Sequence, residues 1–198
     1  SLQMQLLERR LKKFSTYEKL LVPIAVVQHE LSRLSHLVED FLRFARPADL
    51  HLKRFDLLEL LRQVIELLAP EARRLGIELR AELPAGSCSV EGDRAKLQQV
   101  FMNIVRNAIE ALEERGGNIV VATLPPEEDM AVVQVRDDGP GIPEEILLRI
   151  FEPFFSTKPM GTGLGMAICH SLVQQHGGNI AVRSDEGTIV EIRLPGYR

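Results

Sequence analysis

The chain has 198 residues, with 24 Lys and Arg against 28 Asp and Glu, so its formal net charge is −4. Apolar residues make up 45% and charged residues 26%, which is typical of a globular protein and excludes a disordered or fibrous chain. The mild acidity argues against general affinity for nucleic acid or anionic lipid. Two cysteines and the lack of an apolar stretch of about 20 residues predict neither a disulfide framework nor a membrane span, and favour a cytoplasmic setting.

Residues 1–47 are predicted to form two helices. In the second helix, seven apolar residues from Ile24 to Ala45 are spaced alternately by three and four, a seam that requires a partner helix. Ser15 and Glu18 form a capping box that starts this helix. Two short helices bury little surface alone, so we expect a helical hairpin that pairs with a second copy in a four-helix bundle, with a plain coiled-coil linker as the alternative.

After residue 47 the pattern changes to helices mixed with antiparallel strands. This mixture predicts an α+β fold with helices on one face of a sheet. Caps at Asp56 and Asp93 and stops at Gly76 and Gly116 mark the two longest helices. In chain order we expect a connector over 47–54, a helix over 56–75, a strand over 77–83, a helix over 93–114, strands over 118–124 and 130–137 with Pro125-Pro126 in the turn, a loop-rich stretch over 138–162, a helix over 163–176 and a hairpin over 179–194.

Two glycine-rich loops carry the first sign of a ligand site. Residues 137–142 (Asp-Asp-Gly-Pro-Gly-Ile) follow a predicted strand, and residues 161–165 (Gly-Thr-Gly-Leu-Gly) precede a predicted helix. Glycine lets the backbone approach a ligand closely, and a helix N-terminus offers free N–H groups to an anion. Neither loop has Rossmann or Walker spacing, and each alone is also compatible with a plain turn.

Polar side chains near these loops add a second sign. Asn103 and Asn107 are four residues apart, on one face of the predicted helix, where amide oxygens suit a hard cation such as Mg²⁺. The alternative is a pair of surface amides that cap a neighbouring loop. Lys158 directly follows a loop with three Phe and lies beside the second glycine loop, where its ammonium can meet phosphate charge.

Taken in order, these four blocks resemble the nucleotide-binding domain of sensor histidine kinases of two-component systems. The Asn helix resembles the N box of that family, residues 137–141 its first glycine box, residues 151–155 its F box and residues 161–165 its second glycine box. The text over 151–165 is similar to the short-lid, nitrogen-regulatory branch of the GHKL superfamily. The chain departs from the family at 185–188, where only one glycine of the usual final turn is kept. The resemblance implies a Bergerat-type α/β sandwich.

The resemblance also implies Mg²⁺ and ATP as cofactors. Asp137 would accept a hydrogen bond from the adenine amino group, Asn107 with Asn103 would hold Mg²⁺, and Lys158 would bind the outer phosphates. Gly139 and Gly141 would let the lid hinge over the nucleotide. The implied catalytic residues are Asn103, Asn107 and Lys158; the implied nucleotide-binding residues are Asn103, Arg106, Asn107, Asp137, Gly139, Gly141, Ile142, Lys158, Gly161, Thr162, Gly163, Leu164, Gly165 and Thr188.

The family phosphorylates a histidine on the first helix of its hairpin. His29 opens a similar motif, but the next residues depart from it, and His29 is only 18 residues before Pro47, too few for a helix, a turn and a return helix. We therefore interpret His29 and His36 as surface histidines and expect the acceptor upstream of Ser1. His51, His170 and His176 are interpreted as structural.

The sequence therefore predicts a partial dimerisation hairpin over 1–47 and an ATP-binding catalytic domain over 48–198. The resemblance implies a kinase core that phosphorylates a histidine and then a response regulator, which would dock on the hairpin. Any membrane anchor, in the inner membrane, would lie upstream. Two alternatives are a nucleotide-free interaction scaffold and a gyrase- or chaperone-like hydrolytic ATPase. The second is disfavoured because those enzymes carry Glu where this chain has Asn103, and Asn cannot act as a general base.

Overall fold

The computed structural model describes most of the chain after residue 49. The predicted hairpin, with His29 and His36, lies largely outside the described residues, as does the boundary between the two predicted domains. The short part of the hairpin that is described, 23–28 with Leu31, is helical, as expected for the second helix. The described residues are 23–28, 31, 50–127, 129–158 and 161–196.

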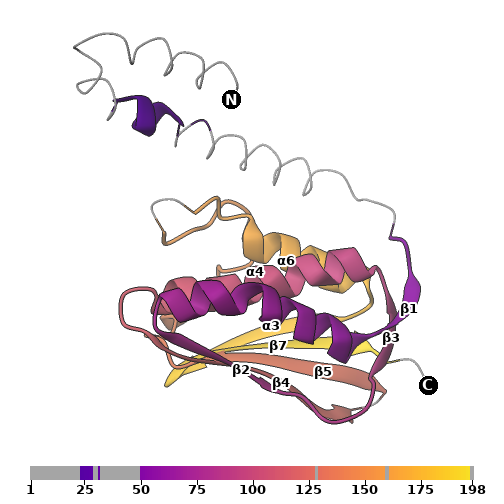
Figure 1. Cartoon of the computed structure of the whole chain (residues 1–198). Helices are drawn as coiled ribbons and strands as arrows, with labels where there is room; N and C mark the ends of the chain where they lie inside the picture. Colours follow the sequence, from indigo (N-terminus) through magenta and orange to yellow (C-terminus); the bar gives the residue numbers. More distant parts are fainter. Residues whose placement is uncertain (1–22, 29–30, 32–49, 128, 159–160, 197–198) are drawn as a thin grey trace, which may run out of the picture.

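The elements of the described chain after residue 49 build a two-layer α+β sandwich (Figure 1). In order they are β1 (Lys53–Asp56), α3 (Leu57–Arg74), β2 (Ile77–Glu82), β3 (Ser89–Gly92), α4 (Arg94–Leu112), β4 (Gly117–Glu127), β5 (Met130–Asp137), α5 (Glu144–Leu147), α6 (Gly165–Gln175), β6 (Asn179–Asp185) and β7 (Gly187–Pro195). The main sheet has the order β2-β4-β5-β7-β6, with β2 parallel to β4 and the other pairs antiparallel. The predicted class, an α+β fold with helices on one face, is confirmed.

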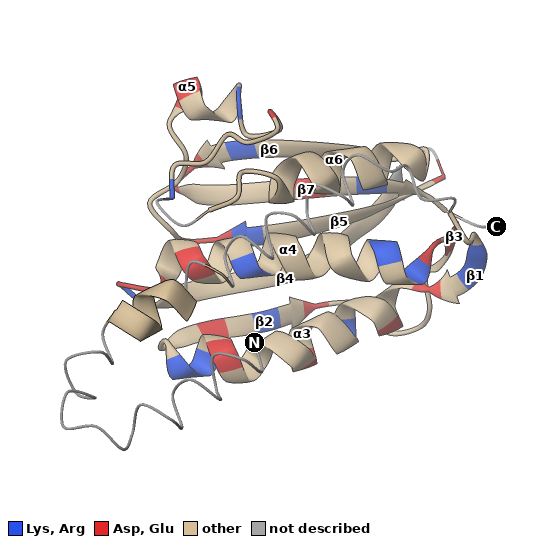
Figure 2. Cartoon of the chain, turned by 90° about the horizontal axis from the view of Figure 1, so that it is seen from above, with Lys and Arg blue, Asp and Glu red and all other residues tan. Residues whose placement is uncertain are grey.

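Helices α3, α4 and α6 lie side by side across one face of the sheet, with α4 in the middle (Figure 2). Each turns an apolar stripe toward the strands, and the fully buried Phe101 of α4 lies in the core that they share. The N-terminal ends of α3 and α4 are capped as the sequence predicts. Asp56 accepts from the Leu58 N–H at 3.0 Å, and Asp93 accepts from the Ala95 N–H at 3.1 Å.

A buried histidine fixes how α4 sits against α6. The backbone N–H of Asp93 donates to Nε2 of His176 at 2.9 Å, and Nδ1 of His176 lies 2.7 Å from the Leu172 carbonyl oxygen. Burial opposes ionisation of Asp93, but N–H groups of His51 and of the first turn of α4 outweigh it and lower the pKa of this carboxyl. His176 thus has the structural role expected from the sequence.

Four features differ from the elements expected. The sequence predicts antiparallel strands, but β2 lies parallel to β4. The four-residue strands β1 and β3 pair with each other in a separate two-stranded sheet. The sequence predicts a connector where β1 begins and no strand at the position of β3. A single turn of helix, α5, interrupts the loop-rich stretch. The prediction that Pro125 and Pro126 form a turn is wrong, because β4 continues through them to Glu127 with a register shift against β5.

Candidate functional site

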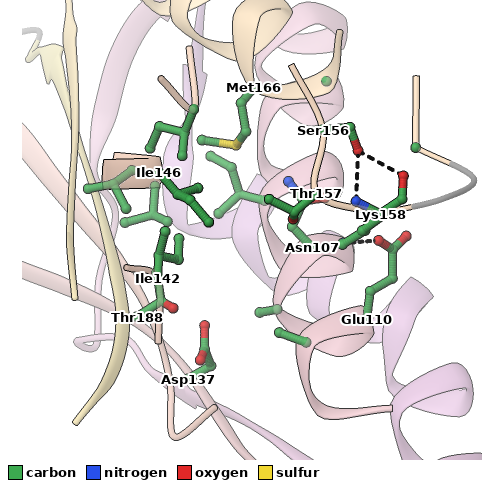
Figure 3. Close-up of a pocket in the computed structure, with 18 of the residues that line it drawn as sticks. Asn107, Glu110, Asp137, Ile142, Ile146, Ser156, Thr157, Lys158, Met166 and Thr188 are labelled. Atoms are coloured by element: carbon green, nitrogen blue, oxygen red, sulfur yellow. Dashed lines mark hydrogen bonds and ion pairs between the residues drawn. The ribbon is translucent and has the colours of Figure 1, made fainter. Parts of the chain in front are cut away.

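A cavity of about 440 Å³ opens between the C-terminal half of α4, the end of β5 and the two glycine loops (Figure 3). Its wall is mostly apolar, and polar groups enter it from two sides. We call Asp137, Gly141 and Thr188 the strand side, together with Ser184 behind the wall, since they lie on β5, β6 and β7 or in the loop after β5. The loop side consists of Asn107, Glu110, Ser156, Lys158 and Gly163, from α4 and the loop before α6.

On the strand side, the sheet register brings Asp137 opposite Thr188. Asp137 is the last residue of β5, and its Cα partner on β7 is Thr188, which is buried. Oδ1 of Asp137 accepts from the Gly139 N–H at 2.9 Å, and Thr188 also donates to the carboxylate. Burial raises the pKa of Asp137 above its ordinary value and the charge of Asp138 adds to the effect, while the hydrogen bonds from Gly139 and Thr188 partly offset it. The result is a fixed, half-buried acceptor that faces the cavity.

The first glycine loop is tied to the β6–β7 turn by one serine. Oγ of Ser184 accepts from the Ile142 N–H at 2.6 Å and donates to the Gly187 carbonyl oxygen at 2.9 Å. Gly141 has a φ of +73°, and a Cβ there would lie 2.6 Å from Oγ of Ser184. The loop therefore needs glycine both for its conformation and for its close approach to the turn.

On the loop side, an ion pair joins α4 to the loop that precedes α6. Asn107 and Glu110 are three residues apart on α4 and both line the cavity. Nζ of Lys158 forms an ion pair with Oε2 of Glu110, and Oγ of Ser156 accepts from the Lys158 N–H at 3.1 Å (Figure 3). The Lys158 and Glu110 side chains are 45% and 40% exposed, so the pair lies at the mouth of the cavity.

The second glycine loop packs closely on two other segments. At Gly163, φ is +68° and a Cβ would lie 2.4 Å from the carbonyl carbon of Phe154. At Gly165, a Cβ would lie 2.7 Å from Nδ2 of Asn103. Glycine at both positions lets the start of α6 lie against α4.

The amide of Asn103 is engaged with the core. Its Nδ2 donates to Sγ of Cys169 at 3.3 Å, and Sγ of Cys169 lies 3.7 Å from the Val100 carbonyl oxygen. Burial raises the pKa of Cys169 to about 12, so its thiol stays protonated. Asn103 therefore occupies the α4–α6 contact, whereas Asn107, one turn later, faces the cavity.

Most residues singled out from the sequence gather around the cavity. Gly139 donates to Asp137 from just behind the wall, Arg106 is exposed on α4, and Leu164 is buried in the core. Asn103 also stands behind the wall. The predicted residues that line the cavity are Asn107, Asp137, Gly141, Ile142, Lys158, Gly161, Thr162, Gly163, Gly165 and Thr188.

Sequence reasoning missed several residues of the site. Glu110 has the pattern of an ordinary charged residue on a helix surface, and Ser184 lies within a strand far along the chain. The apolar part of the wall also carried no motif. It comes from α4, the strands, α5 and α6, and includes Ile104, Val135, Ile146, Met166 and Val190.

Comparison with known proteins identifies the fold and the site region. The family model described as histidine kinase-, DNA gyrase B-, and HSP90-like ATPase matches residues 92–198, more than half of the chain. The chain belongs to this ATPase family. The match includes both glycine loops and all of α4, and membership supports ATP as the ligand.

Curated relatives of this chain include bacterial sporulation kinases and sensor histidine kinases. Sporulation kinase A of Bacillus subtilis is 36% identical over 173 residues, 86% of this chain and 28% of its own length. Sensor histidine kinase ZraS of Escherichia coli is 36% identical over 163 residues, 82% of this chain and 34% of its own length. The chain spans only 23% to 40% of the three sporulation kinases it matches.

Solved structures give the same result for the ATPase fold. The nucleotide-free catalytic domain of histidine kinase ThkA has a TM-score of 0.67 and 36% identity, covering 73% of this chain and 95% of that domain. Histidine kinase ThkA in complex with response regulator protein TrrA has a TM-score of 0.78 and 32% identity, covering 98% of this chain and 57% of that one. Among the described residues, no helix has the length and apolar character to cross a membrane.

Proposed function

We propose that this chain is the ATP-binding kinase core of a two-component sensor histidine kinase. The observation that carries the proposal is the cavity, in which Asp137 and an apolar wall stand on one side and Asn107 and Lys158 on the other. A planar base suits an apolar wall with one fixed acceptor, and phosphates suit the side that holds Lys158 and lies near a helix N-terminus. The sensor kinases among its relatives support the kinase over other ATPases.

Each side would have a separate task. The carboxylate of Asp137 would accept from the exocyclic amino group of adenine, while Thr188 and Gly139 keep the carboxylate in place. Lys158 would leave Glu110 and meet the outer phosphates. The N–H groups at the start of α6 would add further donors. Phosphoryl transfer depends on such positioning and charge neutralisation more than on covalent help from the protein.

The donor set suits a Mg²⁺ that keeps waters and phosphate oxygens as its other ligands. The amide of Asn107 faces the cavity and supplies an oxygen of the type that Mg²⁺ prefers. Asn103, which the sequence pairs with it, would first have to leave Cys169. Bound Mg²⁺ would neutralise charge on the phosphates during transfer.

In the full protein, a histidine nitrogen would form a bond to the γ-phosphorus of ATP. The bond from this phosphorus to the β–γ bridging oxygen would break, and ADP would leave. The phosphoryl group would then pass to an aspartate of a response regulator. The complex of ThkA with TrrA supports this partner class for the present chain. A dimer through the predicted hairpin remains a prediction from the sequence.

The test is a calorimetric titration with a non-hydrolysable ATP analogue and Mg²⁺. We expect one site per chain in the parent. We expect Asp137→Asn to bind at least about tenfold more weakly, because a neutral amide oxygen accepts a weaker hydrogen bond than a carboxylate does. Asp138→Asn is the matched control, because Asp138 bonds to Asn118 outside the cavity. Equal binding by the parent and Asp137→Asn would contradict the proposed site. Absence of binding by the folded parent would contradict the proposed function.

A further inference from the structure

The charges around the cavity do not by themselves suit a triphosphate. Of the described residues that line it, three are charged: Glu110 and Asp137 are acidic, and Lys158 is basic, which gives a net charge of −1. The one ammonium is also neutralised by its ion pair with Glu110. An anionic ligand therefore needs positive charge from outside the chain.

The position of Glu110 points to the source of that charge. Glu110 follows Asn107 by three residues on α4, so both side chains reach the same part of the cavity (Figure 3). Carboxylate and amide oxygens are the groups that divalent cations such as Mg²⁺ take from proteins. The amide of Asn103 is turned toward Cys169, so the carboxylate of Glu110 is the oxygen donor next to Asn107 that faces the cavity.

We propose that Glu110 is a further ligand of the divalent cation, directly or through one water, and that its carboxylate exchanges Lys158 for the cation when metal and nucleotide bind together. This inference rests on the proposed function. The exchange frees the ammonium of Lys158 for the outer phosphates, so one movement supplies two positive partners. An exposed ion pair is weak, and its loss opposes the exchange only slightly.

The exchange makes the metal a condition for binding. Without a cation, the carboxylate of Glu110 repels the phosphates and holds back the lysine. With the cation, the same carboxylate attracts the complex. A purely structural glutamate would affect nucleotide binding equally in the presence and absence of metal, and this difference is what the experiment measures.

The experiment compares two variants that both lack the lysine. Lys158→Met removes the partner of Glu110, so adding Glu110→Gln changes only what the carboxylate does to the ligand. Binding of a non-hydrolysable ATP analogue is measured by calorimetry with Mg²⁺ and with EDTA. With Mg²⁺ we expect the double variant to bind about tenfold more weakly than Lys158→Met. With EDTA we expect equal or tighter binding by the double variant.

Glu113→Gln is the matched control, since Glu113 is exposed at the end of α4 and outside the cavity. This substitution should leave the affinity for the ATP analogue unchanged, both with Mg²⁺ and with EDTA. Equal affinity of Lys158→Met and the double variant in Mg²⁺ would overturn the role of Glu110, as would an equal loss in Mg²⁺ and EDTA. If the folded parent does not bind the analogue with Mg²⁺, the proposed function itself fails and the inference falls with it.

Discussion

The strand side and the loop side of the cavity differ in what holds their side chains. On the strand side, Asp137 and Thr188 sit opposite each other in a paired sheet, and Ser184 bonds to two backbone groups. On the loop side, the contact from the loop to α4 at the cavity mouth is the ion pair of Lys158 with Glu110. Exposed ion pairs contribute about 0–1 kcal/mol, so this contact is far easier to break than a sheet.

The difference teaches which part of a ligand each side can select. A rigid acceptor with a raised pKa suits a group of fixed shape, such as a base. A loop held by an exchangeable ion pair suits phosphates, whose number and metal ligands change during a reaction. We therefore expect substitutions on the strand side to lower the stability of the fold, and substitutions on the loop side to change ligand affinity with little loss of stability.

The largest effect should come from Gly187→Ala, at the first residue of β7 beside Thr188 of the strand side. Gly187 has a φ of +121°, and a Cβ would lie 2.1 Å from the Asp137 carbonyl oxygen. Backbone strain and overpacking together should lower the free energy of unfolding by about 3–5 kcal/mol. Chemical denaturation measures this loss. Gly86→Ala is the control, because Gly86 has a similar φ of +111° with nothing within 4 Å, and should lose only about 1–2 kcal/mol. Equal losses would mean that the contact with Asp137 is unimportant.

The second effect should come from Gly163→Ala on the loop side. The Cβ would lie 2.4 Å from the carbonyl carbon of Phe154, so the loop must shift from the position in which it lines the cavity. We expect affinity for the Mg²⁺-bound ATP analogue to fall about tenfold or more, while the free energy of unfolding changes by about 1 kcal/mol. Gly177→Ala, at a φ of +70° outside the cavity, should show the same change in stability with unchanged affinity. A loss of stability as large as in Gly187→Ala would remove the distinction between the two sides.

The third effect is the pH dependence of binding. Burial raises the pKa of Asp137, so its carboxylate takes up a proton at a higher pH than an exposed aspartate. A protonated carboxyl accepts poorly from an amino group, and affinity should fall by up to about tenfold per pH unit once the pH drops below this pKa. The sign for stability is opposite: a raised pKa in the folded state stabilises the fold at low pH, and this contribution is lost as the pH rises. Calorimetry over a pH series checks the binding, and Glu113→Gln, at an exposed position outside the cavity, should keep the profile of the parent.

The sequence predicts the layers of this fold well because their signals are local. The helices α3, α4 and α6 have apolar periodicity and end signals within their own segments, and the caps at Asp56 and Asp93 are where expected. The strands β1 and β3 are too short to show a pattern, and each is defined by its partner across the chain. Pro125 and Pro126 are turn residues by local rules, yet they lie within β4 where its register shifts against β5.

The site divides in the same way. Asp137, Asn107, Lys158 and the glycine loops stand out by residue type and order, and the structure brings them around one cavity. What escapes the sequence depends on contacts between distant residues. Asn103 meets Cys169, which is 66 residues later, and Glu110 meets Lys158, which is 48 residues later. Spacing along α4 places the two asparagines on one face, but only packing against α6 turns one of them away from the cavity.

The smallest effects are expected when Ser184 and Ser156 are each replaced by alanine. Ser184→Ala removes a partly buried Oγ that serves the Ile142 N–H and the Gly187 carbonyl oxygen, so it should lower the free energy of unfolding by about 1–2 kcal/mol. Ser156→Ala removes an exposed Oγ that bonds only to the backbone of Lys158, and should cost about 0.5 kcal/mol or less. For ligand affinity the order should reverse, because Ser156 shapes the turn that presents Lys158. Denaturation and calorimetry on the same two variants test both orders. The comparison would fail if the two variants were equally stable and Ser184→Ala lowered ligand affinity more than Ser156→Ala did. The loop side, with its ion pair between Lys158 and Glu110, would then not be the part that responds to the ligand.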